Sequence, residues 1–160
     1  MKLLDLFRHK PNLSVLEVHT FLRARHLRDG QVLSEQEIQD KCITNAFVTA
    51  LAAALAGNTS VGTLWYHASG TGSLAEAATD TTLVAEVEAR DIGTHTSAVG
   101  LFTSVATHTY AGIFDIFEHG LFTAAAAGTL ADRTVLGGSI HVVAGDKIEW
   151  TFTMTFASGG

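Results

Sequence analysis

The segment Lys147-Ile148-Glu149-Trp150-Thr151-Phe152-Thr153-Met154-Thr155-Phe156 alternates between two kinds of side chain. One set is large and apolar, and the other set is a lysine, a glutamate and three threonines. Successive side chains of a β-strand point to opposite faces of the sheet. This period of two therefore predicts a strand with one face in the core and the other in solvent.

Other parts of the chain repeat this pattern. Alternation occurs over residues 16–27, 83–90 and 101–110, a further strand is expected at 134–143, and short apolar strands are expected at 63–67, 113–118 and 121–123. We expect the last two to be separated by a break at His119-Gly120. About seven antiparallel strands at this spacing predict a mainly β fold, an antiparallel two-sheet sandwich of jelly-roll-like form.

Two local signals fix smaller elements. Asp29-Gly30 lies between residues 16–27 and 32–37 and predicts a β-hairpin, although residues 33–37 could also begin a helix. A short apolar helix is expected over residues 46–56, capped by Thr44 or Asn45 and ended by Gly57-Asn58. Its large apolar residues recur every four positions, which predicts a stripe against a sheet: Phe47, Leu51 and Leu55, with Val48 beside them.

The length of 160 residues suits one folded domain. We expect an N-terminal arm at 1–14 and a β-sandwich domain at 15–160 that includes the helix at about 45–56. The glycine-rich segment Gly70-Thr71-Gly72 and the Asp80-Thr81-Thr82-Leu83 step are expected to join two strands, with Asp80 holding the turn through its side chain.

Charge is distributed unevenly. Residues 1–42 carry seven basic and six acidic side chains, whereas residues 43–160 carry three basic and ten acidic ones. Nucleic-acid affinity comes largely from Lys and Arg, so an acidic body argues against a nucleic-acid partner. The longest apolar run, about 12 residues, is shorter than the roughly 20 that span a membrane. The charged N-terminus does not resemble a signal peptide, so we expect no membrane partner and folding in the cytoplasm.

The sequence contains no recognisable catalytic motif. Eight histidines are scattered without metal-ligand spacing, and Cys42 is the single cysteine. Glu86, Glu88, Glu118 and His119 are interpreted as residues of solvated strand faces, and Arg133 as an exposed side chain paired with Asp132 or with a neighbouring subunit. We therefore predict no enzyme activity, no catalytic residues, no cofactor and no metal site. A trimer could still gather symmetry copies of one histidine around an ion.

Two sets of residues are the candidate contact sites. Pro11 ends a possible helical turn in the arm, which is either a frayed terminus or a segment that docks on a neighbouring subunit. The second set is the basic cluster on one face of the hairpin. The candidate interaction residues are Leu3, Leu4, Leu6 and Phe7 in the arm, and Arg23, Arg25 and Arg28 in the hairpin.

A series of motifs over residues 17–160 resembles a known group of proteins. The series is Arg28-Asp29-Gly30, Thr44-Asn45-Ala46-Phe47-Val48, Gly70-Thr71-Gly72, Asp80-Thr81-Thr82-Leu83, Glu118-His119-Gly120-Leu121-Phe122-Thr123-Ala124, Ala127-Gly128-Thr129-Leu130-Ala131-Asp132-Arg133 and Ala144-Gly145-Asp146. It is similar to small tailed-bacteriophage virion proteins, described as capsid decoration (cement) proteins or as tail-fibre-like structural proteins.

The resemblance implies a non-enzymatic phage virion structural protein. The expected function is that of a capsid decoration or cement protein, a homotrimer that binds the major capsid protein and stabilises the assembled shell. The expected location is the capsid surface of the virion, after synthesis in the host cytoplasm. The alternative is a tail-fibre or tail-tip module that recognises a host surface.

Overall fold

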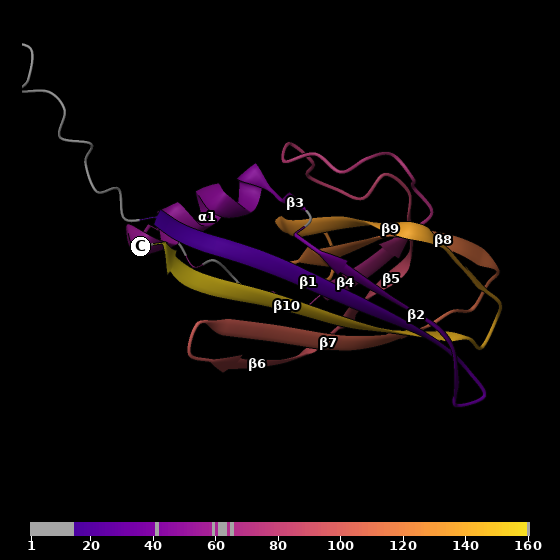
Figure 1. Cartoon of the computed structure of the whole chain (residues 1–160). Coiled ribbons are helices and arrows are strands. Elements are labelled where there is room, and N and C mark those ends of the chain that lie inside the picture. Colours follow the sequence, from indigo (N-terminus) through magenta and orange to yellow (C-terminus); the bar gives the residue numbers. More distant parts are fainter. Residues whose placement is uncertain (1–14, 41, 59, 61–63, 65, 160) are drawn as a thin grey trace, which may run out of the picture.

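The computed structural model describes residues 15–40, 42–58, 60, 64 and 66–159 (Figure 1). These residues form ten strands and one helix. The elements are β1 (Val15–Arg28), β2 (Gln31–Gln39), β3 (Cys42–Ile43), α1 (Asn45–Leu55), β4 (Tyr66–Gly70), β5 (Glu86–Ile92), β6 (Thr94–Ala98), β7 (Leu101–Thr109), β8 (Phe114–Phe122), β9 (Leu130–Val142) and β10 (Lys147–Gly159).

The strands form two five-stranded antiparallel sheets that pack together. The order in sheet A is β2-β1-β10-β7-β6, and the order in sheet B is β3-β9-β8-β4-β5. Figure 1 shows the two sheets as separate layers, with α1 beside them. The predicted mainly β, two-sheet sandwich with one short helix is confirmed. No helix in the described residues is long and apolar enough to cross a membrane.

Strand β10 lies at the centre of sheet A, between β1 and β7. Its even-numbered side chains from Ile148 to Met154 are buried in the core between the sheets, and Phe156 is half-buried at the edge of that core. Leu22 of β1 pairs with Phe152 and is also buried. The strict alternation of this segment therefore marks the inner face of the sheet, as predicted.

The predicted hairpin is also present. Asp29 and Gly30 have φ values of 50° and 77°, so both central residues of the turn are in the left-handed region. Two-residue turns with this geometry match the twist of paired strands, and Asp-Gly adopts it readily. Residues 33–37 continue as part of β2, so the alternative of a helix at that place is wrong.

Helix α1 has the predicted ends but not the predicted burial. The Thr44 hydroxyl accepts a hydrogen bond from the Phe47 backbone N–H at 3.2 Å, and Gly57 has φ 74° just after the helix. Phe47 is buried, but Leu55 is 83% exposed and Val48 is 55% exposed. The prediction that the whole stripe lies against a sheet is therefore wrong, because only the first turn of α1 is buried against the sandwich.

The predicted break at His119-Gly120 does not occur, because β8 continues to Phe122. A Cβ atom on Gly120 would lie 2.8 Å from the Leu83 side chain. This glycine therefore allows close packing within a strand rather than ending it. The segment 94–98 was not predicted as a strand, but it forms β6 at the edge of sheet A. Its side chains are all exposed, so it lacks the apolar alternation that marks a core strand.

The connection between β4 and β5, residues 71–85, covers the outer face of sheet B. Leu83 from this connection packs in a second, smaller apolar cluster away from the main core. The other members of the cluster come from strands of sheet B: Ala68, Phe122 and Leu130, with Tyr66 at its edge. The connection 71–85 therefore forms an additional layer that packs on the outer face of sheet B.

We predict that replacing Phe152 with alanine lowers the free energy of unfolding by about 3–5 kcal/mol, because the change leaves a cavity in the core. Replacing Thr155, which is exposed on the same strand, should change it by less than about 0.5 kcal/mol. Urea unfolding followed by tryptophan fluorescence measures both changes. Similar values for the two variants would contradict the assignment of the strand faces.

Candidate functional site

Glu118 is the most enclosed charged residue of β8. Its side chain is fully buried. Oε1 accepts hydrogen bonds from the backbone N–H groups of Gly72 (3.2 Å) and Ala85 (2.9 Å), and Oε2 accepts one from Val84 N–H (3.2 Å). All three donors belong to the connection 71–85, so this carboxylate holds both ends of the connection against sheet B.

Arg133 of β9 completes the same cluster. Its Nε donates to Glu118 Oε2 at 2.8 Å, and Nη1 donates to Asp80 Oδ2 at 2.8 Å. Nη2 donates to the carbonyl of Leu74 at 2.9 Å, again in the connection. Burial alone would lower the pKa of Arg133, but its hydrogen bonds to Asp80 and Glu118 outweigh this effect and raise the pKa. The guanidinium is therefore charged and paired.

Gly70, at the end of β4, and Gly72, in the connection, both lie against this carboxylate. A Cβ atom on Gly70 would lie 2.6 Å from Glu118 Oε1, and one on Gly72 would lie 2.5 Å from the same atom. Neither glycine has a positive φ. Each position therefore needs the absence of a side chain rather than an unusual backbone conformation. As predicted, Asp80 also holds its own turn, because its carboxylate accepts from the Ala77 N–H at 2.9 Å.

The cluster corrects two sequence-based interpretations. Glu118 and His119 are not on a solvated face, since both are 0% exposed, and Arg133 is 1% exposed. Arg133 pairs with Glu118 and Asp80 rather than with Asp132 or a neighbouring subunit. The local sequence gives no clear signal, because Asp115 lies in the same strand as Glu118 and Asp132 lies next to Arg133. Only the requirement that a buried charge has a partner links these residues.

A second buried cluster joins histidines that the sequence shows only as scattered residues. His67 Nδ1 lies 2.9 Å from His119 Nε2, and His67 Nε2 lies 2.8 Å from the hydroxyl of Ser104. His119 packs against Trp150, with ring centroids 4.8 Å apart. Burial lowers the pKa of His67 to about 3, and burial followed by the nearby His67 lowers that of His119. Both rings are therefore neutral at physiological pH.

Asp132 is a buried carboxyl without a cationic partner among the described residues. Its Oδ1 accepts from the Thr134 hydroxyl at 2.8 Å, whereas Oδ2 has no hydrogen-bond partner. Burial raises the pKa of Asp132 to about 7, although the hydrogen bond from Thr134 acts in the opposite direction. The side chain is therefore poised between its neutral and charged forms near neutral pH.

The two glutamates of β5 also have partners. Glu86 pairs with Arg90, at 2.7 Å between Oε1 and Nε, and Glu88 Oε2 lies 2.6 Å from His108 Nε2. His108 also contacts Asp91 through Nδ1. Burial would lower the pKa of His108, but Asp91 and Glu88 together raise it. These contacts tie β5 of sheet B to β7 of sheet A at the side of the sandwich.

The predicted basic face of the hairpin is largely neutralised by neighbouring acids. Arg28 donates two hydrogen bonds of 2.7 Å to Asp146, and Arg25 pairs with Glu149 at 2.9 Å and with Glu35 at 3.4 Å. Arg23 lies opposite Glu37 in the ladder between β1 and β2, but its buried Nε has no hydrogen-bond partner. Leu3, Leu4, Leu6 and Phe7 lie outside the described residues. The structure thus does not bring the three arginines together as an unpaired basic patch.

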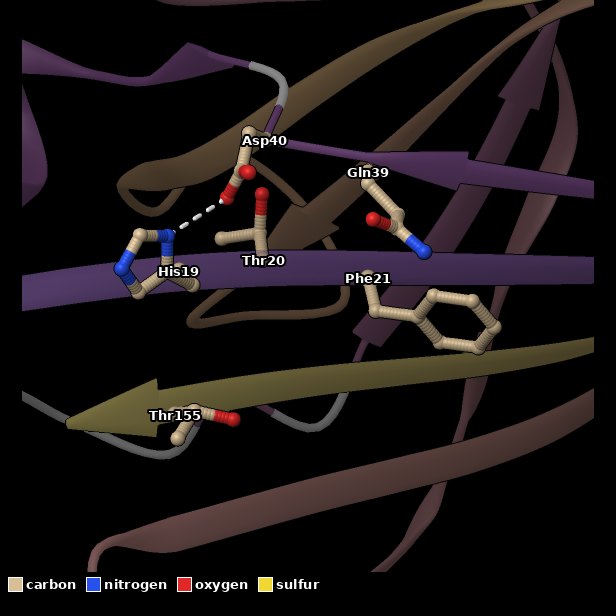
Figure 2. Close-up of a pocket in the computed structure, with 6 residues that line it drawn as sticks. All are labelled: His19, Thr20, Phe21, Gln39, Asp40 and Thr155. Atoms are coloured by element: carbon tan, nitrogen blue, oxygen red, sulfur yellow. Dashed lines mark hydrogen bonds and ion pairs between the residues drawn. The ribbon is translucent and has the colours of Figure 1, made fainter. Parts of the chain in front are cut away.

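The outer face of sheet A carries a shallow hollow of about 270 Å³ between β1, β2 and β10. Figure 2 shows His19 and Asp40 facing one another at its rim, with Thr155 on the adjacent strand. His19 Nδ1 lies 3.0 Å from Asp40 Oδ1, and this hydrogen bond raises the pKa of His19. Both side chains are more than half exposed, so the hollow does not isolate them from water.

Two groups of side chains with catalytic potential are buried in the interior, whereas the His19–Asp40 pair is open to solvent. Ser104, His67 and His119 lie between the sheets, while Glu118 and Arg133 lie beneath the connection. Among the described residues there is no group of three or more side chains that could hold a metal ion. In this arrangement the buried side chains hold strands and the connection 71–85 in place. Buried Asp132, whose pKa is raised to about 7, can also bind a proton near neutral pH. Comparisons with protein-family models, curated proteins and solved structures find no match to this chain.

We predict that Glu118→Gln lowers the free energy of unfolding by about 3–5 kcal/mol. An amide group replaces one acceptor oxygen with a donor, and the buried Arg133 loses one of its two charged partners. The matched control is Glu35→Gln, which removes a half-exposed pair with Arg25 and should cost less than about 1 kcal/mol. Urea unfolding of both variants tests this, and equal small changes would contradict a structural role for Glu118.

We predict that Asp132→Asn stabilises the protein above pH 7 and that the gain shrinks as the pH falls. The folded-state pKa of Asp132 is raised to about 7, whereas an unfolded Asp has a pKa of about 3.9. Between these values the folded state binds a proton that the unfolded state does not, so the wild type gains stability as the pH falls, by up to about 1.4 kcal/mol per pH unit. The variant lacks this gain.

The measurement is the difference in unfolding free energy between Asp132→Asn and the wild type at pH 8, 6.5 and 5. The two buried histidines act in the other direction. Their lowered pKa values make both proteins lose stability as the pH falls below about 6.5, and this loss cancels in the difference. A difference that stays constant with pH would show that Asp132 does not titrate in this range.

Proposed function

We propose that this chain is a non-enzymatic structural protein of a bacteriophage virion. The role we favour is a capsid decoration or cement protein, a homotrimer on the capsid surface that binds the major capsid protein and stabilises the assembled shell. The resemblance of residues 17–160 to such proteins suggests the class. The distribution of polar and apolar side chains in the structure supports an assembly role.

The observation that carries the proposal is that polar clusters are buried while several large apolar side chains, in addition to those of the core, are exposed. The buried clusters consist of histidines, a serine and charged side chains, and each cluster holds strands or connections together. The most exposed are Val99 (105%), Leu55 (83%), Ile113 (69%), Leu74 (67%) and Ile92 (62%). Where exposed apolar residues form a contiguous patch they mark protein contact sites, and these five are the candidates for contact with a partner.

The electrostatics agree with a protein partner. The chain carries a net charge of −6, and Arg25 and Arg28 on the hairpin are neutralised by neighbouring acids. This distribution disfavours the phosphate backbone of nucleic acid as a partner. A protein that binds only the assembled shell stabilises it by mass action, without any reaction. The exposed apolar residues and the outer loops would supply the contacts.

The test is the number of copies of this chain in purified virions, measured by quantitative mass spectrometry against the major capsid protein. A decoration protein is expected in hundreds of copies, in a fixed ratio to the capsid subunits. A handful of copies would contradict decoration and would favour the alternative, a tail-fibre or tail-tip module that recognises a host surface. Absence from the virion would overturn both roles.

A further inference from the structure

Helix α1 presents an apolar stripe on its outward side. Val48 and Leu55 are 55% and 83% exposed, and Ala52 between them is also exposed. These three residues are spaced by four and three positions, which places them along one line of the helix surface. Phe47 packs inward, about a quarter-turn or more around the helix from these residues. The segment Asn45–Leu55 contains no charged residue, and a helix that is apolar on all sides is normally buried.

The end of the helix adds an electrostatic preference to this stripe. The last turn of α1 contains no basic residue, so its terminal carbonyls carry the partial negative charge of the helix dipole without a nearby cation. The body around it is acidic. Residues 15–160 carry seven basic and fifteen acidic side chains, a net charge of −8. The surface therefore fits a segment that is both apolar and positively charged.

The arm at residues 1–14 has this composition. It contains Leu3, Leu4, Leu6 and Phe7, and its three basic residues against one acid give a net charge of +2. It precedes β1, which begins on the side of the molecule where α1 lies (Figure 1). The chain thus contains a segment that complements, in both apolar character and charge, the stripe that its own fold leaves uncovered.

We propose that residues Leu3–Phe7 of one copy bind the stripe Val48–Ala52–Leu55 on α1 of a neighbouring copy. The inference rests on the proposed homotrimer and names the contact that forms it. Eight residue steps from Phe7 to Val15 span about 26–29 Å when extended, and Pro11 favours an extended conformation at Lys10. The arm is therefore long enough to leave its own subunit.

A neighbouring copy offers the arm the same complementary charge as its own subunit, because the arm carries +2 and each body carries −8. A contact between two different surfaces, arm and stripe, repeats head to tail and closes into a ring when the rotation permits. Three such contacts would close a trimer.

Disulfide trapping tests the pairing directly. In a Cys42→Ala background, Phe7→Cys and Leu55→Cys are introduced into separate full-length chains of different mass, which are mixed under mild oxidation. The expected result is a disulfide between the two different chains. The matched control is Leu33→Cys, because Leu33 is also an exposed leucine (51%) but lies on the hairpin. It should react with Phe7→Cys at least ten times more slowly.

A chain that carries both Phe7→Cys and Leu55→Cys distinguishes exchange from folding back. Disulfides that form only within such a chain would overturn exchange between copies. Equal reaction at Leu33→Cys, or no reaction at either position, would overturn binding to the stripe.

Sedimentation equilibrium provides a second readout without cysteines. Leu55→Asp should raise the concentration at which half of the oligomer dissociates by at least tenfold, whereas Leu33→Asp should leave it unchanged. Both leucines are exposed, so neither change should affect folding, and circular dichroism checks this. A wild-type chain that stays monomeric at all concentrations would overturn the arm contact. High copy number in virions would then still support decoration, so the two proposals can fail separately.

Discussion

The buried pairing of Glu118 with Arg133 is the interaction on which the outer layer of sheet B depends. The Glu118 carboxylate accepts hydrogen bonds from three backbone N–H groups of the connection 71–85. The Arg133 guanidinium donates to the carbonyl of Leu74 in the same connection. A buried ion pair adds little stability compared with an apolar pair of the same size, but losing one partner is costly. The pair therefore specifies where the connection lies. It also explains Gly70 and Gly72, whose missing side chains make room for the carboxylate.

Buried polar side chains also link strands in the core between the sheets. His67 and His119 are hydrogen-bonded across β4 and β8, and His67 reaches Ser104 on β7 of the other sheet. Residue types that often carry catalysis are thus used here to connect strands. Apolar side chains, by contrast, remain on the outside of α1 and the loops. Buried polar clusters, together with apolar side chains that remain exposed outside the apolar core, suit a chain that acts through contacts, and this is the physical basis of the proposed role in a virion.

The sequence predicts the elements whose signals are local. The alternation around Phe152, the Asp29-Gly30 turn and the ends of α1 each depend on neighbouring residues, and the structure has all three. It does not predict pairings between distant residues. Glu118 meets the connection more than thirty residues away, and His67 meets His119 across 52 residues. The prediction of a break at Gly120 is wrong because a glycine is needed there to make room for the Leu83 side chain, which is far away in the sequence. Among the candidate contact residues, the sequence places the three arginines on the hairpin. It does not reveal the acidic residues that pair with Arg25 and Arg28.

The most direct test of whether Glu118 serves the structure is amide hydrogen exchange at Gly72, Val84 and Ala85. These three N–H groups lie in a connection without regular secondary structure, and in this account the buried carboxylate is their acceptor. They should exchange as slowly as amides in the centre of β8 and β10, because both need the same opening of the fold. Exchange at the rate of an exposed loop would contradict this. Glu118 would then be free for another role.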